Sequence, residues 1–307
     1  IKFMNIRKIL VKIFNKKKYA EFKNKEIEKK NAQLYHNLIK PKLNEISNAI
    51  KKKNELTFLH SGHLGDIINS LPLIKEISKF KKCSLFLETN KLLPDNAQGA
   101  KHPFGKYFLN EKSVKKIMPL LLKQNYLEKV QIFNNQNIDI NLNLFREMPL
   151  NFNIDSVRWY SHITGIHGDL DKPYLINVGE HKIKDKIVII RTTRRKNYLI
   201  NYNFLKNYNN VLFLGLADEY NDLKKEVPNL EFYDCIDFLE MAEIINSSKV
   251  FIGNLSFGFT LAEGLKKPRL LESGPDFPLV YPNGKDAYDF YFQDHFENNL
   301  KKLLIKK

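Results

Sequence analysis

The chain has 307 residues, which is more than one ordinary domain needs and fits two domains of about 150 residues each. None of its apolar runs approaches the roughly 18 to 20 residues that span a bilayer, so we expect no transmembrane helix. The formal net charge is +16, and residues 1–55 hold 16 Lys and Arg against 5 Glu, so the excess lies mainly in the N-terminal segment. A general bias toward Lys, Asn and Ile is an alternative source of this charge. The two cysteines, Cys83 and Cys235, lie far apart, which favours a reducing, cytoplasmic setting.

The N-terminal segment predicts charged helices. We expect Met4 to be the natural start of the chain. Residues 4–18 combine apolar positions at helical spacing with many Lys and Arg, a pattern typical of a basic amphipathic helix. Such a helix can lie on an anionic membrane surface, and packing on the protein's own body is the alternative. Residues 19–53 predict two more helices separated by Pro41. We assign residues 1–54 to a basic helical extension.

The stretch 56–72, LTFLHSGHLGDIINSLP, predicts a strand, a tight turn and a helix. Gly62 and Gly65 in the turn permit positive φ angles and the close approach of another molecule, and His63 lies between them. Asp66 falls where the helix should begin. A carboxylate at this place either caps free backbone N–H groups or carries chemistry, and the spacing alone leaves both interpretations open.

The region that follows alternates between strands and helices. The predicted elements are strands at 84–89 and within 130–145 and a helix at 111–124. The segment 90–110 is too long for a simple connection and is a candidate acceptor loop. Arg146, expected at the end of a strand, and Arg158 are candidates for lining the same cleft as Asp66, with structural pairing as the alternative.

A second alternating series begins after a polar segment at 170–186, in which we place a domain boundary. Its predicted elements are strands at 186–193, 210–216, 230–234, 250–254 and 268–272 and helices at 237–247 and 294–305. Alternating strands and helices imply parallel sheets with ligands at the carboxyl ends of the strands.

Three places in this second series are candidates for binding a nucleotide. The run 192–198, TTRRKNY, brings hydroxyls and cations to the end of a strand, which suits a diphosphate, although a solvent-exposed basic turn is the alternative. Asp218 and Glu219 follow the next strand, where a carboxylate can accept hydrogen bonds from ribose hydroxyls or serve as a first-turn helix acid. A helix predicted near Phe259 would turn its free N–H groups toward a phosphate.

Three segments together resemble glycosyltransferase family 9, the heptosyltransferase-like enzymes. GDIINSLPLIKEI resembles the family's N-terminal Gly-Asp and Leu-Pro signature, and the run 192–198 resembles its Thr-Thr-Arg, Lys and aromatic segment. Residues 251–275 resemble its Gly-Asn/Asp-Asp-Ser-Gly, His-Leu-Ala and Gly-Lys-Pro segment. Leu255 stands where the family usually has an Asp that contacts the donor sugar, and Thr260 stands where it has a His. These departures predict that the donor sugar is not read in the heptosyltransferase manner.

The resemblance implies an α/β fold of GT-B type, with two Rossmann-like domains facing a central cleft. Residues 55–175 would form the acceptor domain, and residues 176–307 the nucleotide-sugar donor domain, whose last helix would pack back on the first domain. The implied activity is inverting, metal-independent transfer of a sugar from a nucleotide-diphosphate donor to a hydroxyl of a glycan or glycolipid acceptor, with Asp66 as the general base. No cofactor is implied.

The same resemblance implies a binding role for each of the other site residues. Those expected to hold the donor diphosphate are Thr192, Thr193, Lys196, Ser256, Phe257 and Gly258. Glu219, or failing it Asp218, would hold the ribose. The residues assigned to the acceptor or its loop are Gly62, His63, Gly65, Arg146 and Arg158.

Two other functions remain open at this stage. One is a sugar-nucleotide epimerase or hydrolase with the same fold. The other is a non-catalytic protein of this fold, or a basic protein that binds a membrane or nucleic acid, of which nucleic acid has the least support. The expected location is the cytoplasm, with peripheral association at the inner face of the membrane through residues 4–18 as an option.

Overall fold

The structure is a computed structural model that describes residues 12–93, 105–274 and 280–305. The chain divides into two compact units, residues 1–51 and 52–307. The expected boundaries of the two domains beyond residue 54 stay predictions.

The N-terminal unit is helical. Its elements are α2 (Lys16–Leu34), a π-helical turn η1 (Tyr35–Ile39) and α3 (Lys40–Lys52). Helix α2 starts after Asn15, whose side chain accepts a hydrogen bond from the Lys18 N–H group across 2.9 Å. Pro41 has no N–H group to donate to the preceding turn, and the helix widens into a π-turn just before it. The expected helix over residues 4–18 lies partly outside the described residues.

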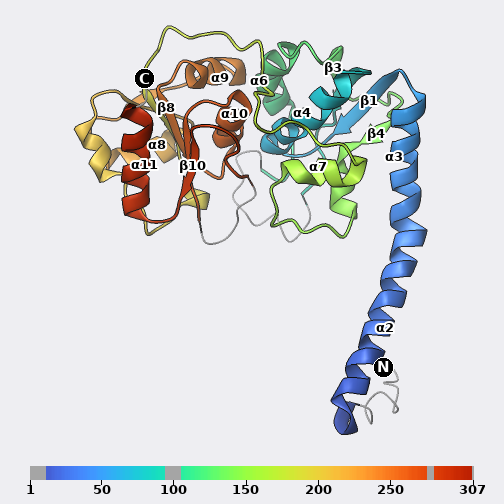
Figure 1. The fold of residues 1–307 in the computed structure, drawn as a ribbon. Coiled ribbons are helices and arrows are strands. Elements are labelled where there is room, and N and C mark those ends of the chain that lie inside the picture. Colours follow the sequence, from blue (N-terminus) through green and yellow to red (C-terminus); the bar gives the residue numbers. More distant parts are fainter. Residues whose placement is uncertain (1–11, 94–104, 275–279, 306–307) are drawn as a thin grey trace. The chain divides into compact units, whose positions relative to one another are not determined.

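The first sheet of the second unit contains four parallel strands in the order β3-β2-β1-β4. The strands are β1 (Glu55–His60), β2 (Lys82–Leu87), β3 (Lys129–Ile132) and β4 (Ile140–Asn141). The helices and the 3-10 turn that accompany them are α4 (Leu64–Ser78), α6 (Glu111–Leu122), η2 (Leu142–Glu147) and α7 (Val157–Thr164). The strand, turn and helix expected around Asp66 are therefore present (Figure 1).

One predicted strand is largely wrong. Residues 142–147 form the 3-10 turn η2, so β4 ends at Asn141. The Asn141 side chain accepts a hydrogen bond from the Asn143 N–H group across 3.0 Å, and this local bond competes with continued strand pairing. Arg146 consequently leaves a tight turn at the end of β4 rather than an extended strand.

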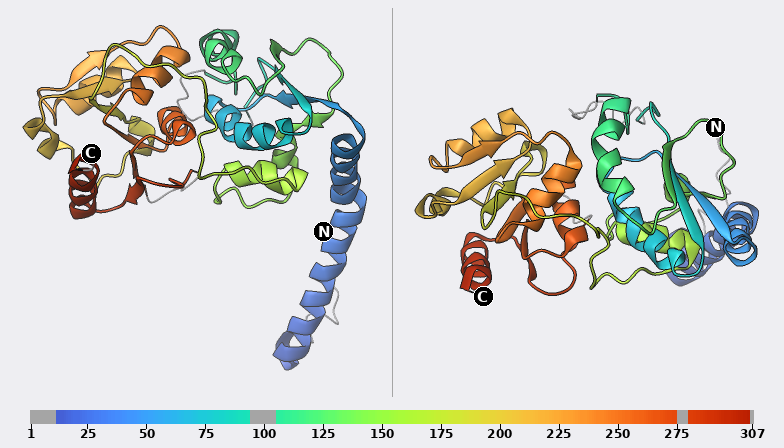
Figure 2. Two further views of the ribbon diagram at one scale, coloured as in Figure 1. Left: turned by 45° about the horizontal axis from the view of Figure 1, so that its top comes forward. Right: turned by 90° about the horizontal axis from the view of Figure 1, so that it is seen from above.

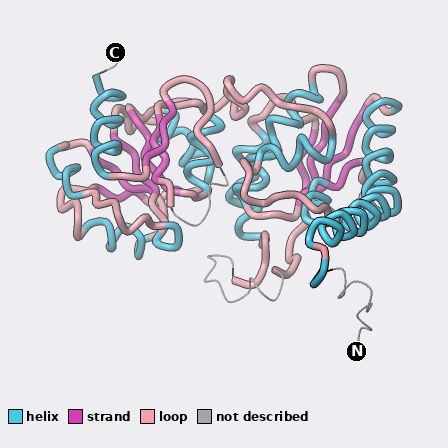
Figure 3. Tube along the Cα trace, turned by 60° about the horizontal axis from the view of Figure 1, so that its bottom comes forward, coloured by secondary structure: helices cyan, strands magenta, loops and turns pink. Residues whose placement is uncertain are grey.

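The second sheet contains six parallel strands in the order β10-β9-β8-β5-β6-β7. The strands are β5 (Ile187–Ile190), β6 (Val211–Leu214), β7 (Glu231–Tyr233), β8 (Val250–Asn254), β9 (Arg269–Glu272) and β10 (Ala287–Phe290). The 3-10 turns and helices among them are η3 (Thr193–Arg195), η4 (Asn203–Asn207), α8 (Ala217–Lys224), α9 (Phe238–Asn246), α10 (Phe257–Leu265) and α11 (Gln293–Ile305). Figure 3 shows the strands of both sheets with helices around them.

Helix α11 belongs to the second sheet. We expected it to cross back to the first domain, but its apolar residues Phe296, Leu300 and Leu303 are buried in the core formed by β5, β6, β8 and β9. Phe296 stacks on Phe290 of β10, with ring centroids 4.1 Å apart. The prediction was wrong because β10, which the sequence pattern did not reveal, provides a nearby apolar surface for this helix.

Helices α4 and α10 pack against each other between the two sheets, and α6 packs against α9 (Figures 1 and 2). At the first of these contacts, a Cβ atom placed on Gly65 would lie 3.5 Å from Cγ2 of Thr260. The expected α/β fold with two parallel sheets is confirmed. Cys83 and Cys235 are both buried free thiols, and burial raises the pKa of each to about 12.

None of the described helices has both the length and the apolar character needed to cross a membrane.

Candidate functional site

Asp66 lies in the first turn of α4, and its carboxylate is bound from two sides. Its Oδ2 atom accepts a hydrogen bond from the His63 N–H group across 3.2 Å, so the carboxylate does cap the helix. The same oxygen accepts from Nη2 of Arg146 across 2.7 Å. Oδ1 accepts no hydrogen bond from the residues that the structure describes.

Arg146 is itself held in place. Its Nη1 atom donates to Oδ1 of Asn143 across 3.1 Å, and the same Asn143 oxygen accepts from the Ser61 N–H group across 2.9 Å. The guanidinium lies 4.7 Å from the ring centroid of Phe108 and 4.4 Å from that of Phe145. These contacts bind turn η2 to the turn before α4, so the carboxylate and the guanidinium are positioned as a pair.

A glycine is needed at residue 62 because a larger side chain would collide with its neighbours, and not because of its φ angle. A Cβ atom at this residue would lie 2.7 Å from Nη2 of Arg146 and 2.8 Å from Oδ2 of Asp66. Neither Gly62 nor Gly65 has a positive φ angle, so neither uses the freedom that a glycine permits, and the close approach of another molecule to this turn stays a prediction. The neighbours that approach Gly62 are this ion pair and the His60 ring, whose Cε1 atom would lie 2.6 Å from the Cβ atom.

His60 has a structural role beneath this turn. Its Nδ1 atom accepts from the Gly62 N–H group and its Nε2 atom lies 2.9 Å from the Tyr160 hydroxyl, so the bonds assign the proton to Nε2. The Tyr160 hydroxyl in turn donates to the backbone oxygen of Asp66 across 2.8 Å. Burial lowers the pKa of His60 to about 3, which keeps the imidazole neutral. This chain of bonds holds the start of α4 and ends at the backbone oxygen of Asp66 rather than at its carboxylate.

The His63 ring packs beside the same pair. Its centroid lies 5.0 Å from that of Phe108. Burial lowers the pKa of His63, while the Asp66 carboxylate acts in the opposite direction. Of the residues assigned to the acceptor, the structure thus gathers Gly62, His63 and Arg146 around Asp66.

On the donor side, Thr192 lies two residues after the end of β5 and is fixed by Asn254 at the end of β8. The Asn254 amide accepts from the Thr192 N–H group across 2.9 Å and donates to the Thr192 carbonyl across 2.7 Å. The Thr192 residue is only 5% exposed, and its Oγ1 atom has no hydrogen-bond partner within the described part of the chain. A buried hydroxyl without a partner is costly unless a ligand binds it.

The N-terminus of α10 lies beside this hydroxyl. Ser256 is the N-cap residue, yet its side chain does not cap the helix, and its Oγ atom is also buried without a partner among the described residues. A Cβ atom on Gly258 would lie 2.4 Å from Cδ1 of Ile190, so the glycine lets the helix start lie against the end of β5. Free N–H groups and two unpartnered hydroxyls therefore lie at one edge of the sheet, an arrangement suited to an anion.

Glu219 and Asp218 differ in their surroundings. Glu219, in the first turn of α8, is 9% exposed, and burial raises the pKa of its carboxyl. The Thr192 hydroxyl faces this carboxylate but does not meet the geometry of a hydrogen bond. The hydroxyl and the Arg194 guanidinium each lower the pKa of Glu219 and so partly offset the effect of burial. Asp218 instead accepts from the Glu219 N–H group across 3.0 Å. Of the two acids, Glu219 is therefore the one that faces Thr192.

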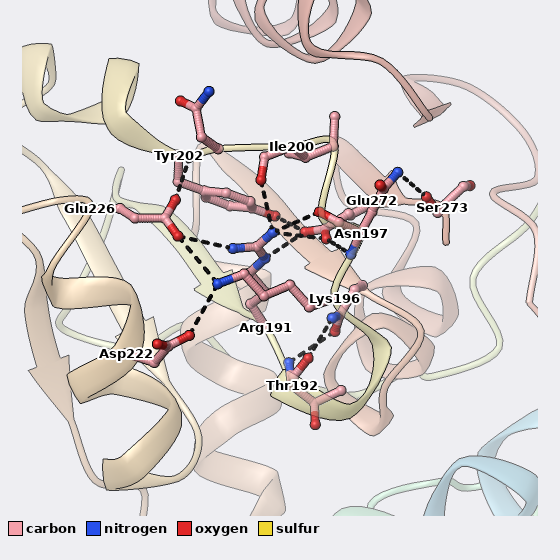
Figure 4. A network of polar contacts seen from close by, with 12 residues as sticks. Arg191, Thr192, Lys196, Asn197, Ile200, Tyr202, Asp222, Glu226, Glu272 and Ser273 are labelled. Carbon is pink, nitrogen blue, oxygen red and sulfur yellow. Dashed lines mark hydrogen bonds and ion pairs between the residues drawn. The ribbon is translucent and has the colours of Figure 1, made fainter. Parts of the chain in front are cut away.

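Lys196 lies in an acidic network rather than at the helix N-terminus (Figure 4). Its Nζ atom is 3.2 Å from Oδ2 of Asp222 and 3.3 Å from Oε1 of Glu226. Glu226 also accepts from the Tyr202 N–H group across 2.7 Å. Figure 4 shows the Thr192 side chain pointing away from this network.

A buried ion pair shapes the loop from 191 to 202. Nε and Nη2 of Arg191 donate to the two carboxylate oxygens of Glu272 at 2.7 and 2.9 Å. Glu272 also accepts from the Tyr202 hydroxyl across 2.7 Å and from the Asn197 N–H group across 2.6 Å. Because β5 and β9 carry this pair, the loop that presents Thr192 is fixed to the sheet from both ends.

Several expected residues lie elsewhere or are otherwise engaged. Thr193 is exposed in turn η3. Arg158 lines a separate cavity of about 350 Å³ with His167, Asp169 and Asn283, and neither Asp66 nor Thr192 lines that cavity. The Thr260 hydroxyl donates to the Phe257 carbonyl across 2.7 Å inside its own helix. Much of the expected acceptor loop, residues 94–104, lies outside the described residues.

Sequence reasoning assigned no role to two residues that the structure places beside Asp66 and Thr192, namely Asn143 and Asn254. Asn254 ends a clear strand pattern, so its position at a carboxyl edge was the available signal. Asn143 acts through its contact with the turn before α4, which lies far away in the sequence. Among the described residues no group of three or more His, Cys, Asp or Glu side chains is arranged to hold a metal ion.

No protein-family model matches this chain, and no curated protein matches it significantly. Solved structures do match. Escherichia coli heptosyltransferase WaaC with ADP-2-deoxy-2-fluoro heptose aligns with a TM-score of 0.54 and 10% identity, covering 81% of this chain and 99% of the other. The same enzyme with ADP aligns with a TM-score of 0.52 and 10% identity, covering 82% and 99%. This chain has the GT-B fold.

The GT-B fold implied by the sequence resemblance is thereby confirmed. A family 9 glycosyl transferase from Veillonella parvula also aligns, with a TM-score of 0.49 and 10% identity over 83% of this chain and 90% of the other. In this GT-B chain Asp66 follows the first strand of one sheet, and Thr192 follows the first strand of the other. The two candidate groups thus occupy corresponding carboxyl edges of the two halves.

Proposed function

We propose that this protein is an inverting glycosyltransferase that moves a sugar from a nucleotide-diphosphate donor to a hydroxyl of a glycan or glycolipid acceptor. The observation that carries the proposal is the pair of buried hydroxyls without partners, on Thr192 and Ser256, beside the N-terminus of α10. A diphosphate provides the acceptor oxygens that these groups and the free N–H groups require. The fold supports the same class of ligand, since the matching E. coli enzyme was solved with ADP and with an ADP-sugar analogue.

Asp66 is the proposed general base. Its Oδ1 atom would accept the proton of the acceptor hydroxyl while that oxygen attacks the anomeric carbon from the face opposite the diphosphate. The bond from the anomeric carbon to the diphosphate oxygen breaks, and the configuration at the carbon is inverted. Such general base catalysis contributes about 10²- to 10⁴-fold in rate. Arg146 and the His63 N–H group hold Oδ2, which directs Oδ1 to the acceptor.

The leaving diphosphate would be stabilised by the two hydroxyls and the N–H groups at the start of α10, on Phe257 and Gly258. Preorganised donors of this kind act on the charge that develops as the bond breaks. Glu219, which faces Thr192, would accept hydrogen bonds from the ribose hydroxyls. This set supplies charge stabilisation from the protein, so we propose a reaction without a metal ion or cofactor.

The donor sugar is proposed to differ from heptose. Leu255 offers no hydrogen bond to a sugar hydroxyl, and the Thr260 hydroxyl is already bound to the backbone of its own helix. A site that lacks these polar groups discriminates against a sugar that needs them.

A thermal-shift screen tests the proposal. The full chain is mixed with ADP, GDP, UDP and CDP and with their common sugar conjugates, and one nucleotide series is expected to raise Tm. A ligand at 100 times its Kd stabilises a protein by about 2.7 kcal/mol. The stabilising nucleotide sugar is then incubated with and without glycan acceptors. Stoichiometric turnover without acceptor would instead indicate an epimerase or a hydrolase, and no shift with any nucleotide at millimolar concentration would overturn the proposal.

We also propose that the N-terminal unit associates with the inner face of an anionic membrane. Helix α2 has no buried residue, and the unit exposes large apolar side chains, including Ile13 (65% exposed), Phe14 (80% exposed) and Phe22 (43% exposed), among its many lysines. Lysine side chains are attracted to anionic headgroups, and apolar side chains can enter the interface. A nucleic acid would satisfy the lysines but not the exposed aliphatic groups.

A further inference from the structure

The donor diphosphate carries negative charge that a cation of the 192–198 loop can neutralise. Two cations of this loop, Arg194 and Lys196, differ in their surroundings. Lys196 is already paired with two carboxylates, those of Asp222 and Glu226. Moving its Nζ atom to a phosphate would separate it from both acids, which would then lose their shared cation. The two carboxylates hold the Lys196 ammonium from two sides, so the lysine is positioned within this acidic network.

Arg194 has no such partners. It lies two residues after Thr192 in turn η3, its side chain is exposed, and it forms no ion pair or hydrogen bond with the described residues. Its guanidinium is close enough to Glu219, at the start of α8, and to His63, at the start of α4, to affect the pKa of each group. The cation therefore lies near the candidate ribose acid and near the turn that carries the candidate base.

We propose that Arg194, and not Lys196, is the cation that binds the donor diphosphate, and that Lys196 is a positioning residue that braces the loop. This inference rests on the proposed function. A guanidinium matches a phosphate better than an ammonium does, because its planar N–H groups donate two parallel hydrogen bonds. Thr192 and Ser256 would then supply the hydroxyl donors, the start of α10 the N–H donors, and Arg194 the full positive charge.

The role of Arg194 in the reaction follows from the change in charge during sugar transfer. The proton of the acceptor hydroxyl moves to Asp66, and the acceptor oxygen forms the new bond to the anomeric carbon. The electron pair of the breaking bond moves to the terminal phosphate oxygen of the nucleoside diphosphate, whose charge becomes more negative by one. Arg194 would stabilise that added charge, so its loss should slow transfer as well as weaken binding.

The test uses the full chain and four single substitutions: Arg194→Ala, Arg194→Lys, Lys196→Met and, as a control of equal charge, Arg195→Ala. Wild-type protein is titrated calorimetrically with ADP, GDP, UDP and CDP and with the four parent nucleosides. For the nucleotide that binds best, Arg194→Ala should weaken the diphosphate by about 10- to 100-fold, from the loss of one charge-assisted contact, and leave the nucleoside unchanged. Arg194→Lys should recover part of the difference. The salt dependence of diphosphate binding should also decrease in Arg194→Ala.

Lys196→Met should keep the diphosphate affinity within about 3-fold and lower Tm, because Asp222 and Glu226 lose their shared cation. Arg195→Ala should leave the diphosphate affinity unchanged. Diphosphate binding within 2-fold of wild type in Arg194→Ala, or a loss of 10-fold or more in Lys196→Met at unchanged Tm, would overturn the inference while the proposed function stands. Wild-type protein that binds no nucleoside diphosphate would overturn both.

Discussion

Nη2 of Arg146 lies 2.7 Å from Oδ2 of Asp66, and these two residues are 80 positions apart in the chain. The pair joins the turn after β4 to the first turn of α4, and it orients the carboxylate proposed as the general base. Asp66→Asn should reduce sugar transfer by about 10²- to 10⁴-fold, because the amide cannot take the acceptor proton. Nucleoside diphosphate binding, measured by calorimetry, should persist.

Glu76→Gln is the matched control for Asp66→Asn. Glu76 lies on the same helix and pairs on the surface with Lys79 across 2.6 Å, so its neutralisation should leave transfer at the wild-type rate. Full transfer activity in Asp66→Asn would remove Asp66 from the mechanism.

Two glycine substitutions in the same turn should have opposite effects on stability. Gly62→Ala forces a Cβ atom to 2.7 Å from Nη2 of Arg146, and such overpacking costs about 1 to 3 kcal/mol. Gly65→Ala places its Cβ atom 3.5 Å from the Thr260 side chain, an ordinary contact, and alanine is favoured over glycine in a helix by about 0.5 to 1 kcal/mol. Chemical denaturation of both variants measures the difference. A stable Gly62→Ala protein would contradict the close packing of the ion pair.

His60 should make folding stability depend on pH. The pKa of His60 is lowered from 6.5 to about 3 in the folded protein, so the unfolded chain binds the proton more tightly. The contribution of the neutral His60 side chain to folding stability is fully present above pH 6.5 and is lost as the pH falls toward 3. When the pH is lowered from 7 to 4, the free energy of unfolding of the wild type should fall by about 3 kcal/mol more than that of His60→Gln. Urea titrations at each pH measure this difference. His162→Gln, which changes an exposed histidine, should follow the wild-type curve.

The buried Arg191 and Glu272 pair should matter far more than an exposed pair. Glu272→Gln removes the closer of the two carboxylates paired with Arg191, in a site where the Glu272 side chain is 0% exposed, and leaves Glu226 at 3.6 Å; the expected cost is about 3 to 5 kcal/mol. Glu231→Gln breaks the Lys186 pair, in which the Glu231 side chain is 50% exposed, and should cost less than about 1 kcal/mol. Equal effects of the two variants on the urea midpoint would contradict a structural role for the buried pair.

Membrane association should require the exposed aromatic residues of the N-terminal unit. In co-sedimentation with vesicles of phosphatidylglycerol and phosphatidylcholine, the full chain should bind, and binding should fall with salt and in vesicles of phosphatidylcholine alone. Phe14→Ser combined with Phe22→Ser should weaken binding several-fold. Phe80→Ser, which removes an aromatic residue that is 56% exposed in the other unit, is the control. Binding that survives in the double variant, or that duplex DNA abolishes in wild type, would count against a lipid partner.

The parts of this molecule that could be predicted from sequence are those that depend on local pattern. The apolar run of β1, the helical spacing of α4 and the position of Asp66 between them all follow from neighbouring residues. The same is true of β5 and of α10, whose start was expected near Phe259 and lies at Phe257. These are also the places where the sequence resemblance was strongest.

The remaining contacts depend on segments that only the fold brings together. Arg146 reaches Asp66 because β4 pairs with β1, and a two-residue strand has too little pattern to be recognised. Lys196 matched the expected motif, but its partners come from α8 and from the turn after it, so its engagement could not be seen in the motif. Helix α11 was misplaced because the strand that covers it, β10, was not recognised.

The two cysteines have a practical consequence. Cys83 and Cys235 are buried, and with pKa values of about 12 they hold almost no thiolate at neutral pH. A maleimide dye should therefore leave the native protein unlabelled and react selectively with a cysteine introduced at a surface position. Fluorophores placed in this way would allow distances between the two sheets to be followed in solution without first removing a native thiol.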